Sequence, residues 1–580
     1  MNILFLLKFN LILAIVFFII PDYKKAIRIL APALSLAGFI ISIIIMLKSE
    51  ICVADYLIWD SLSRLVYFFT GFFGVLLAVY SAGFIEEKLN KYFSYFFLTL
   101  FSAYGIVLSG NWIAFTVFWG ISGISLYLLM QTSPEANPAA KKTMIILGAS
   151  DSFLILAVAV LYKLTGSFSI VPAGWSLLAA VGLLIAGFAK AGNMPFHTWI
   201  PECADKAPIP VTAFLPASMD KLLGIYLLAR SFSILNFTQE VKIAVMLAGA
   251  ITILCAVYMA LAQHSAKKLL SYHAVSQVGY MVLGIGTGNI LGLAGGIFHM
   301  VNHAIYKSCL FLGAGQVEKI KNTDNLEKLG NLAKFLPVTF ICMLIAALSI
   351  SGIPPFNGFY SKWLIYQGVI SSLTTTRYPL ITILCLIAAL FGSALTLASF
   401  MKLIHAIFLG PHDAASEEKT LAKERFPLVM PQAVLALACI ALGIFAKDLF
   451  IKPVFGRLYP MGVWFPKTAA IMIIAGIILG ILIYFISGIK IRRTKSYIGG
   501  ENISARMRIS GVEFYSSIEN IFPFRQIYAL AAKKVFDIYE VMKTLLLYMT
   551  SLLKYLHNGV LNNYLSWIFA GGIIILLVIW

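Results

Sequence analysis

The sequence predicts an all-α, multi-pass membrane protein, and three observations carry that prediction. Of its 580 residues, 60% are hydrophobic and only 12% are Asp, Glu, Lys or Arg, whereas a soluble protein carries roughly 25% charged residues. Apolar stretches long enough to cross a bilayer follow one another along almost the whole chain. Two of these stretches are interrupted by glycine and proline. This composition excludes a water-soluble multidomain enzyme.

Counting stretches of about 20 apolar residues predicts about sixteen transmembrane helices. The block 359–410 is too long for one helix and is expected to hold two, and the boundary between 272–289 and 290–316 stays open. The predicted spans lie near residues 3–20, 28–47, 62–85, 93–109, 111–130, 143–163, 175–192, 209–232, 241–263, 272–289, 290–316, 335–351, 359–410, 427–446, 467–487 and 564–580.

The charges orient these spans. The chain has 44 Lys and Arg against 25 Asp and Glu, a net charge of +19. With this span numbering the lysine-rich loops fall on one face, and the positive-inside rule makes that face cytoplasmic. We therefore expect a multi-pass protein of the cell membrane with its basic loops in the cytoplasm and no nucleic-acid partner. The loop residues concerned are Lys24, Lys25, Arg28, Lys88, Lys91, Lys141, Lys142, Lys267, Lys268, Lys319, Lys321, Lys328 and Lys334.

The segment 489–563 departs from this pattern because it is long, mixed and basic. Within it, residues 527–556 place apolar side chains at helical spacing between charges, which predicts an amphipathic helix too polar to span. We expect this helix to lie on the cytoplasmic surface or along a neighbouring subunit. An ordinary interfacial helix that touches no partner is the alternative.

An ionisable side chain inside a span costs roughly 2.5–3.5 kcal/mol, so each one is a candidate for function. Lys190 ends an apolar run just before a break that contains Gly192 and Pro195, and Asp220 and Lys221 lie inside the next run. A lysine at such a break suits a proton relay, although a structural lysine that reaches the interface explains Lys190 equally well.

The arrangement recurs at a second Gly/Pro break, which contains Pro354 and Pro355 and is followed by Lys362. Two interrupted apolar segments in corresponding places indicate the site of an inverted-repeat transporter. Between them, His299, His303 and Lys307 are spaced four residues apart and share a helix face.

Histidine titrates near neutral pH, so this file is a candidate row of proton stops. A metal site is a poor fit there because no third ligand is evident. Lys402 and His405, late in the block 359–410, are either a proton exit or groups that extend to the interface.

Several motifs resemble the antiporter-like subunits of respiratory complex I, of Mrp-type cation/proton antiporters and of energy-converting membrane-bound hydrogenases. The match covers about residues 60–410. The motifs are Lys190…Pro195-Phe-His-x-Trp-x-Pro201, Ala207-Pro…Pro210-Val, Met219-x-Lys-x-x-Gly-x-Tyr226, Lys268-x-Leu-Ser-Tyr272, Ser276-Gln-x-Gly-Tyr280, His299…His303-x-x-x-Lys-x-x-x-Phe311 and Gly352-Ile-Pro-Pro-x-x-Gly-Phe-x-Ser-Lys362.

The resemblance implies two inverted five-helix repeats, each with a broken helix, to which the residue pattern adds a C-terminal amphipathic surface helix and a terminal span. It assigns proton or ion translocation to Lys190, Lys221 and Lys362, with His299, His303 and Lys307 as the central axis. The implied organisation is N-terminal transmembrane helices 1–92, a first repeat 93–232, a second repeat 241–410, additional helices 427–487, a lateral segment 488–563 and a terminal helix 564–580.

One departure from the family matters. The family usually has a Trp-Glu pair where this chain has Trp119 followed by Gly120, and that glutamate pairs with the first lysine. A buried lysine without its partner is strongly unfavourable unless it is neutral or paired again. We expect Asp151 or Asp220 to take over part of this role. The rival hypothesis is a degenerate half that no longer conducts.

The tail narrows the resemblance. The motifs Tyr497-Ile-Gly-Gly-Glu501, Phe514-Tyr515, Phe536-Asp-Ile-Tyr539 and Leu556-His-Asn-Gly…Tyr564-Leu-x-Trp567 are more similar to large subunits of hydrogenase and formate-hydrogenlyase-type complexes than to those of complex I.

The leading hypothesis is therefore an ion-translocating subunit, for protons or Na⁺, of a redox-driven membrane complex. Antiporter-like sister subunits and a redox arm would be its partners in the bilayer. The alternatives are a subunit of an Mrp-type Na⁺/H⁺ antiporter and a non-conducting scaffold.

We expect no cofactor and no redox or hydrolytic residue on this chain. Its seven cysteines are scattered without a Cys-x-x-Cys pair, which argues against an iron–sulfur, haem or zinc site built by this chain alone.

Overall fold

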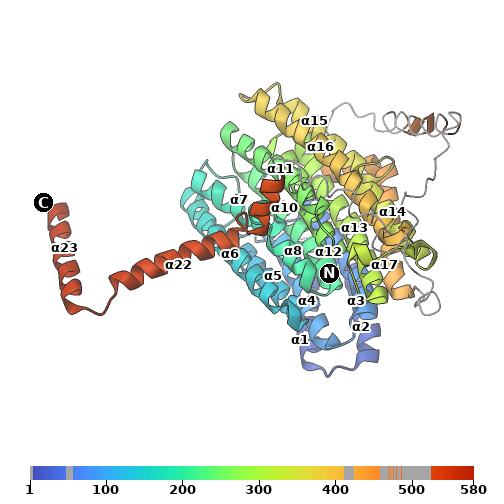
Figure 1. Cartoon of the computed structure of the whole chain (residues 1–580), viewed down its shortest axis with the longest axis horizontal. Helices are drawn as coiled ribbons and strands as arrows, with labels where there is room; N and C mark the ends of the chain where they lie inside the picture. The colour runs from blue at the N-terminus through green and yellow to red at the C-terminus, as the bar shows by residue number, and fades with distance from the viewer. Residues whose placement is uncertain are drawn as a thin grey trace, which may run out of the picture. The chain divides into compact units, whose positions relative to one another are not determined.

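The computed structural model describes residues 4–47, 56–410, 424–456 and 524–579, with isolated helical positions between 468 and 485. The chain divides into two compact units, Met1–Asn520 and Ile521–Trp580. Within the described residues, regular structure is helical apart from isolated β-bridges. Figure 1 shows the helices of the first unit packed in a bundle, with the blue N-terminal helices and the yellow α15 and α16 on opposite sides. The all-α prediction is confirmed.

The first half of the bundle begins with long apolar helices. Polar residues start several of them, because a side-chain oxygen at the N-cap accepts a hydrogen bond from an otherwise unpaired backbone amide. Asn111 does so for α5, and Ser176 for α7. The helices are α1 (Leu4–Ile19), α2 (Lys24–Leu47), α3 (Ser61–Phe84), α4 (Leu89–Leu108), α5 (Trp112–Met130), α6 (Asn137–Thr165), α7 (Leu177–Ala191), α8 (Trp199–Lys206), α9 (Ile209–Phe214), the π-turn Leu215–Met219 and α10 (Asp220–Ile234).

The second half repeats this alternation of long and interrupted helices. Ser265 caps α12 and Asn289 caps α13. The helices are α11 (Gln239–Leu261), α12 (Ala266–Gly286), α13 (Ile290–Lys321), α14 (Pro337–Ser351), α15 (Asn357–Ser372), α16 (Pro379–Ile404) with the π-turn His405–Leu409, α17 (Phe426–Ile444), the π-turn Lys447–Ile451 and α18 (Lys452–Phe455).

Ten helices within the described residues are long and apolar enough to cross a membrane, and three shorter ones are apolar. The chain is therefore a multi-pass membrane protein. The long helices α12 and α13 are not among these because they carry polar residues such as Gln277 and His303. The block 359–410 does hold two helices, and the open boundary near residue 289 falls between α12 and α13. The span predicted at 467–487 lies largely outside the described residues.

Both predicted helix breaks are present. The helix α7 ends at Ala191 before α8, and α14 ends at Ser351 before α15. Both helices are followed by a glycine with positive φ, Gly192 at +80° and Gly352 at +82°. Residues with a Cβ rarely adopt this conformation. Pro195, Pro354 and Pro355 follow within these breaks.

The second unit corrects one expectation. The predicted amphipathic helix 527–556 is two helices, α21 (Phe524–Ala532) and α22 (Ile538–Leu556), followed by α23 (Leu561–Ile579). The break falls where Lys534 adopts a positive φ and the Asp537 side chain accepts a hydrogen bond from the Tyr539 amide. Apolar periodicity continues across this turn, so it does not reveal a cap inside the segment. The apolar residues of α22, including Leu545 and Leu552, are exposed.

A charged clamp joins α3 to α10. The guanidinium of Arg230 donates two hydrogen bonds to Asp60, the N-cap residue of α3, one of them 2.6 Å long between Nη2 and Oδ1. Burial alone would raise the pKa of the Asp60 carboxyl, but the hydrogen bonds and positive charge of Arg230, with Ser63, hold that pKa below its ordinary value of 3.8. The ionised carboxyl is therefore favoured by folding.

Asp60→Asn is expected to destabilise the protein by about 1–2 kcal/mol at neutral pH, because the buried Arg230 loses the negative charge that it pairs with. The loss stays this small because Asp60 is half-exposed and its charge is screened by solvent. A carboxyl with a lowered folded-state pKa stabilises the fold above its unfolded pKa, and this stabilisation is lost as pH falls through the folded value. The difference in Tm between wild type and variant should thus be full near pH 7 and shrink below about pH 4. A difference that is constant with pH would contradict this origin.

Candidate functional site

The predicted translocation residues are all buried inside the first unit. Lys190 and Lys362 are 2% exposed, and Lys221, His299, His303 and Lys307 are fully buried. Six buried ionisable groups in one helical bundle are costly, so their partners decide what they can do.

Lys190 lies at the centre of a cluster formed by α5, α6, α7 and α10. Its ammonium donates a hydrogen bond to Ser122, lies 4.7 Å from the centre of the Trp119 ring and is 3.8 Å from the Asp220 carboxylate. The indole of Trp119 in turn donates to Asp151 over 2.8 Å. The negative charges of both predicted carboxylates therefore favour the charged form of Lys190. Asp220 is the nearer one, and Asp151 lies on the other side of the contact with Trp119.

Lys221 reaches the first helix break. Its ammonium donates a hydrogen bond to the carbonyl oxygen of Ala191, the last residue of α7. Unpaired carbonyls at a helix C-terminus carry partial negative charge, which favours a cation there. A side chain at Gly192 would press against this ammonium, with a Cβ only 3.0 Å from Nζ. The glycine therefore provides the space that Lys221 fills.

Lys362 occupies the matching place at the second break. Its ammonium donates to the carbonyl of Ile350 at the end of α14 and to Ser393 Oγ, each over 2.9 Å, and lies 4.6 Å from the Tyr280 ring centre. A Cβ at Gly352 would lie 3.1 Å from the Lys362 side chain. By local geometry Lys362 thus corresponds to Lys221, whereas Lys190 lies on α7, before its break.

The three residues of α13 lie between these clusters. The His299 ring contacts Ser361 over 2.9 Å and Gln277 over 3.1 Å, and Lys307 donates to the Leu270 carbonyl over 2.7 Å. Neither ring nitrogen of His303 has a hydrogen-bond partner among the described protein groups. These contacts fix the outer two side chains, whereas the fully buried His303 ring is held by none of these hydrogen bonds.

The charges of these residues act on one another in sequence along the bundle. A positive charge on Lys221 disfavours a positive charge on Lys307, and the charges of both lysines disfavour a positive charge on His303. Lys362 acts on His299. The structure thus brings the six residues into one connected row, with Asp151 and Asp220 at its first end.

Lys402 and His405, the predicted exit, are not brought together. The Lys402 ammonium donates to the carbonyls of Leu261 and Gln263 at the end of α11, over 2.7 and 3.0 Å, so it also caps a helix C-terminus. His405 lies in the π-turn after α16 and is exposed. Lys402 therefore has a structural contact that explains it without an exit role.

Gly120 has room for a side chain. A Cβ built there meets no heavy atom within 4 Å. The absent glutamate of the family could therefore be restored at this position without a clash on its Cβ.

Four site residues escaped the sequence-based prediction. Ser122 and Ser393 receive hydrogen bonds from the two lysines, Tyr280 lies beside Lys362, and His273 is a fully buried histidine of α12. Serine and tyrosine are common in transmembrane helices and give no signal by themselves. His273 carried one, because it is an ionisable residue inside a predicted span.

Ion pairs join several basic residues near helix ends to neighbouring helices. Lys142 pairs with Glu202 over 2.5 Å, Lys267 with Glu318 over 2.6 Å and Lys319 with Glu86 over 2.9 Å. These pairs join α6 to α8, α12 to α13, and α13 to the end of α3. Three of the basic residues near helix ends thus hold neighbouring helices together.

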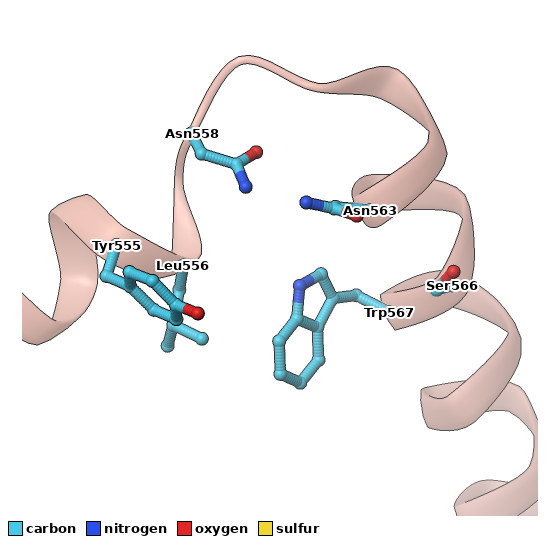
Figure 2. Close-up of a pocket in the computed structure, with 6 residues that line it drawn as sticks. All are labelled: Tyr555, Leu556, Asn558, Asn563, Ser566 and Trp567. Atoms are coloured by element: carbon cyan, nitrogen blue, oxygen red, sulfur yellow. The ribbon is translucent and has the colours of Figure 1, made fainter.

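No group of three or more His, Cys, Asp or Glu side chains placed to hold a metal ion occurs among the described residues. A hollow of about 390 Å³ lies in the second unit, where Figure 2 shows Asn558 and Asn563 facing each other above Trp567. No Lys, His, Asp or Glu lines it, so it offers no ion-carrying group. Its lining residues are Tyr555, Leu556, Asn558, Asn563, Ser566 and Trp567.

Comparison of the sequence with known proteins identifies one family. Residues 109–396 match the family described as NADH:quinone oxidoreductase/Mrp antiporter, transmembrane. The A1 component of a Na⁺/H⁺ antiporter of Staphylococcus haemolyticus is 31% identical over 416 residues, which are 67% of this chain and 52% of that protein. The A/B component of a probable K⁺/H⁺ antiporter of Rhizobium meliloti is 30% identical over 386 residues, 64% of this chain and 38% of that protein. The chain thus spans about half the length, or less, of these relatives.

Two solved structures share the fold. A chain of the membrane-bound sulfane sulfur reductase, an archaeal respiratory membrane complex, superposes with a TM-score of 0.80 at 20% identity, covering 99% of both chains. A chain of the Mrp complex from Dietzia sp. DQ12-45-1b superposes with a TM-score of 0.66 at 22% identity, covering 76% of this chain and 94% of the other.

Proposed function

This chain belongs, through residues 109–396, to the transmembrane family of NADH:quinone oxidoreductases and Mrp antiporters, and from that premise we propose that it translocates protons within a redox-driven membrane complex. Its partners would be antiporter-like sister subunits and a redox arm, and the tail favours a complex of the hydrogenase or formate-hydrogenlyase type. The basic face would be cytoplasmic.

The observation that carries this proposal is the row of buried ionisable side chains between the two broken helices. Lys221 and Lys362 each hold an ammonium against the C-terminal carbonyls of a broken helix, where the helix dipole stabilises positive charge. The charges of Lys221 and Lys307 both disfavour a positive charge on the buried His303 ring. Such an arrangement suits a proton that moves between sites of comparable energy.

The chemistry follows from repulsion between like charges. A proton on Lys221 disfavours a second charge on Lys307, and the carboxylate of Asp220 favours the charged form of Lys190. A change in the Lys190–Asp220 pair would therefore alter the charge state of the next residues and pass a proton along the row. Each of these steps moves a proton between side chains and involves no electron transfer.

A second candidate is an Mrp-type cation/proton antiporter subunit, which the names of the relatives at about 30% identity favour. It would use the same row, driven by an ion gradient alone. A non-conducting scaffold is disfavoured because Lys190 retains two carboxylates in place of the family glutamate.

Purification of the native complex in mild detergent tests these alternatives. We expect redox subunits to copurify, and the complex in vesicles to admit protons under a K⁺/valinomycin diffusion potential. Copurification of antiporter subunits alone would favour the second candidate. Vesicles with intact complex but no proton or Na⁺ flux would contradict translocation.

Asp151→Asn is expected to slow proton flux about tenfold if Asp151 replaces part of the missing glutamate. The variant retains the hydrogen bond to Trp119 but removes the negative charge that acts on Lys190. Adding Gly120→Glu to this variant should restore part of the flux, because a carboxylate returns to the position that it occupies in the family, next to the Trp119 whose ring contacts Lys190, and its Cβ has space.

Gly120→Glu in the wild type is the matched control and should assemble normally. Full flux in Asp151→Asn would show that Asp220 alone supplies the partner.

A further inference from the structure

The row described above connects α13 to Lys362 through His299, but it gives Lys307 no direct link to Lys362. Lys307 contacts a carbonyl of α12, and Lys362 contacts α14 and α16. The surface between them is one face of α12. Leu270, His273, Gln277 and Tyr280 share that face, because successive members are three or four residues apart.

His273 is the histidine on this face. It is fully buried, and its ring centre lies 4.7 Å from that of Phe400. The ammonium of Lys307 lies 5.3 Å from the centre of the same Phe400 ring. Lys307 and His273 therefore meet at one side chain of α16.

The other residues of the face lead to Lys362. The amide oxygen of Gln277, one turn beyond His273, accepts a hydrogen bond from His299 Nε2 over 3.1 Å, and the Tyr280 ring centre lies 4.6 Å from the Lys362 ammonium. The charges of Lys307 and Lys362 both act on His273. It is thus the histidine placed between the two lysines on α12.

The hydrogen-bonding state of His273 fits a mobile proton. A neutral imidazole has one donor and one acceptor nitrogen, and neither nitrogen of His273 is bonded to a protein group in the described part of the chain. Buried polar atoms without a protein partner normally bond to water. Both nitrogens are therefore available to take a proton on one side and release it on the other.

We propose that His273 carries protons between Lys307 and Lys362. This inference rests on the proposed translocation function and assigns to α12 a link, within the second half, between Lys307 on α13 and Lys362 on α15. A proton moves from the Lys307 ammonium to one ring nitrogen, and the other nitrogen releases a proton toward Lys362, so charge and atoms balance without any further reactant.

Two substitutions separate proton transfer from packing. His273→Leu keeps a side chain of similar volume and removes two unpaired polar atoms, so it should not weaken the fold. His273→Gln keeps hydrogen bonding to water but cannot titrate. The matched control is His264→Gln in the turn before α12, where the side chain is 55% exposed.

The measurement is proton flux into vesicles that contain the purified complex, driven by a K⁺/valinomycin diffusion potential. We expect both His273 variants to lose about tenfold or more of the flux, with assembly unchanged by size-exclusion chromatography, and His264→Gln to keep wild-type flux. Wild-type flux in His273→Leu would show a packing role and overturn the inference. Wild-type flux in His273→Gln alone would show that the residue only positions water, which also overturns it.

The failure of the proposed function is a different result. Wild-type vesicles without flux, or wild-type flux after Lys362→Ala, would contradict translocation along the row itself. Loss of flux in Lys362→Ala with full flux in both His273 variants would contradict the role of His273 alone.

Discussion

Asp220→Ala is expected to abolish proton flux and to destabilise the complex by about 3–5 kcal/mol, the cost of breaking a buried ion pair on one side. Asp220 is fully buried, and its carboxylate lies 3.8 Å from the Lys190 ammonium and next to Lys221 in the chain. Its removal leaves two buried lysines with only the more distant Asp151 for compensation. The lysines would then lose their protons or the helices would separate.

Thermal unfolding of the purified complex and flux into vesicles measure the two effects. Asp220→Asn is the isosteric comparison, and Asp205→Asn is the control, because Asp205 pairs with Lys268 over 3.4 Å at the basic face. The control should change little, since partly exposed pairs contribute about 0–1 kcal/mol. Wild-type stability of Asp220→Ala would mean that Lys190 and Lys221 are neutral in the folded protein.

Lys362→Ala is expected to reduce proton flux by about a hundredfold or more, which is the typical contribution of a positioned proton-transfer group. The substitution removes the only ammonium that contacts both the end of α14 and Ser393 among the described residues. Its neighbours Tyr280 and Tyr366 still contact Ser393, so the local packing has support without the lysine. Lys362→Met, which keeps the length of the side chain, should lose flux equally.

Lys319→Met is the matched control for this experiment. Lys319 pairs with Glu86 at the basic face and lies outside the row, so its replacement should leave flux within about twofold, as expected for an exposed pair. The same assay on Lys190→Ala tests the first half. Unchanged flux in both Lys190→Ala and Lys362→Ala would reject the row as the path.

The fold class could be predicted from composition and apolar length because a bilayer forces every spanning segment to satisfy its own backbone hydrogen bonds. The two helix breaks were also predictable, since glycine and proline interrupt apolar runs at Gly192 and Gly352. The break between α21 and α22 was not, because the cap formed by Asp537 lies inside a segment whose apolar spacing continues.

The candidate residues were chosen from the sequence by the cost of an ionisable group in a membrane, by the two Gly/Pro breaks and by the family resemblance. Together these selected Lys190, Lys221, Lys307 and Lys362 with His299 and His303, all of which the structure buries. The burial cost alone, applied to every span, would have selected His273 as well. The burial cost does not reveal which groups form ion pairs or hydrogen bonds with these side chains, because it depends only on the residue and its depth in the membrane.

The sequence by itself thus determined that the chain crosses a membrane and which side chains are too costly to be there without a reason. Only the tertiary structure decided that Asp220 lies 3.8 Å from Lys190, that Asp151 accepts a hydrogen bond from the Trp119 ring beside this lysine, and that Lys221 and Lys362 cap the two broken helices. Lys402 likewise proved to contact the end of α11. The physical reason is that pairing in a low-dielectric interior depends on separations of a few ångströms between different helices, which spacing along one chain does not contain.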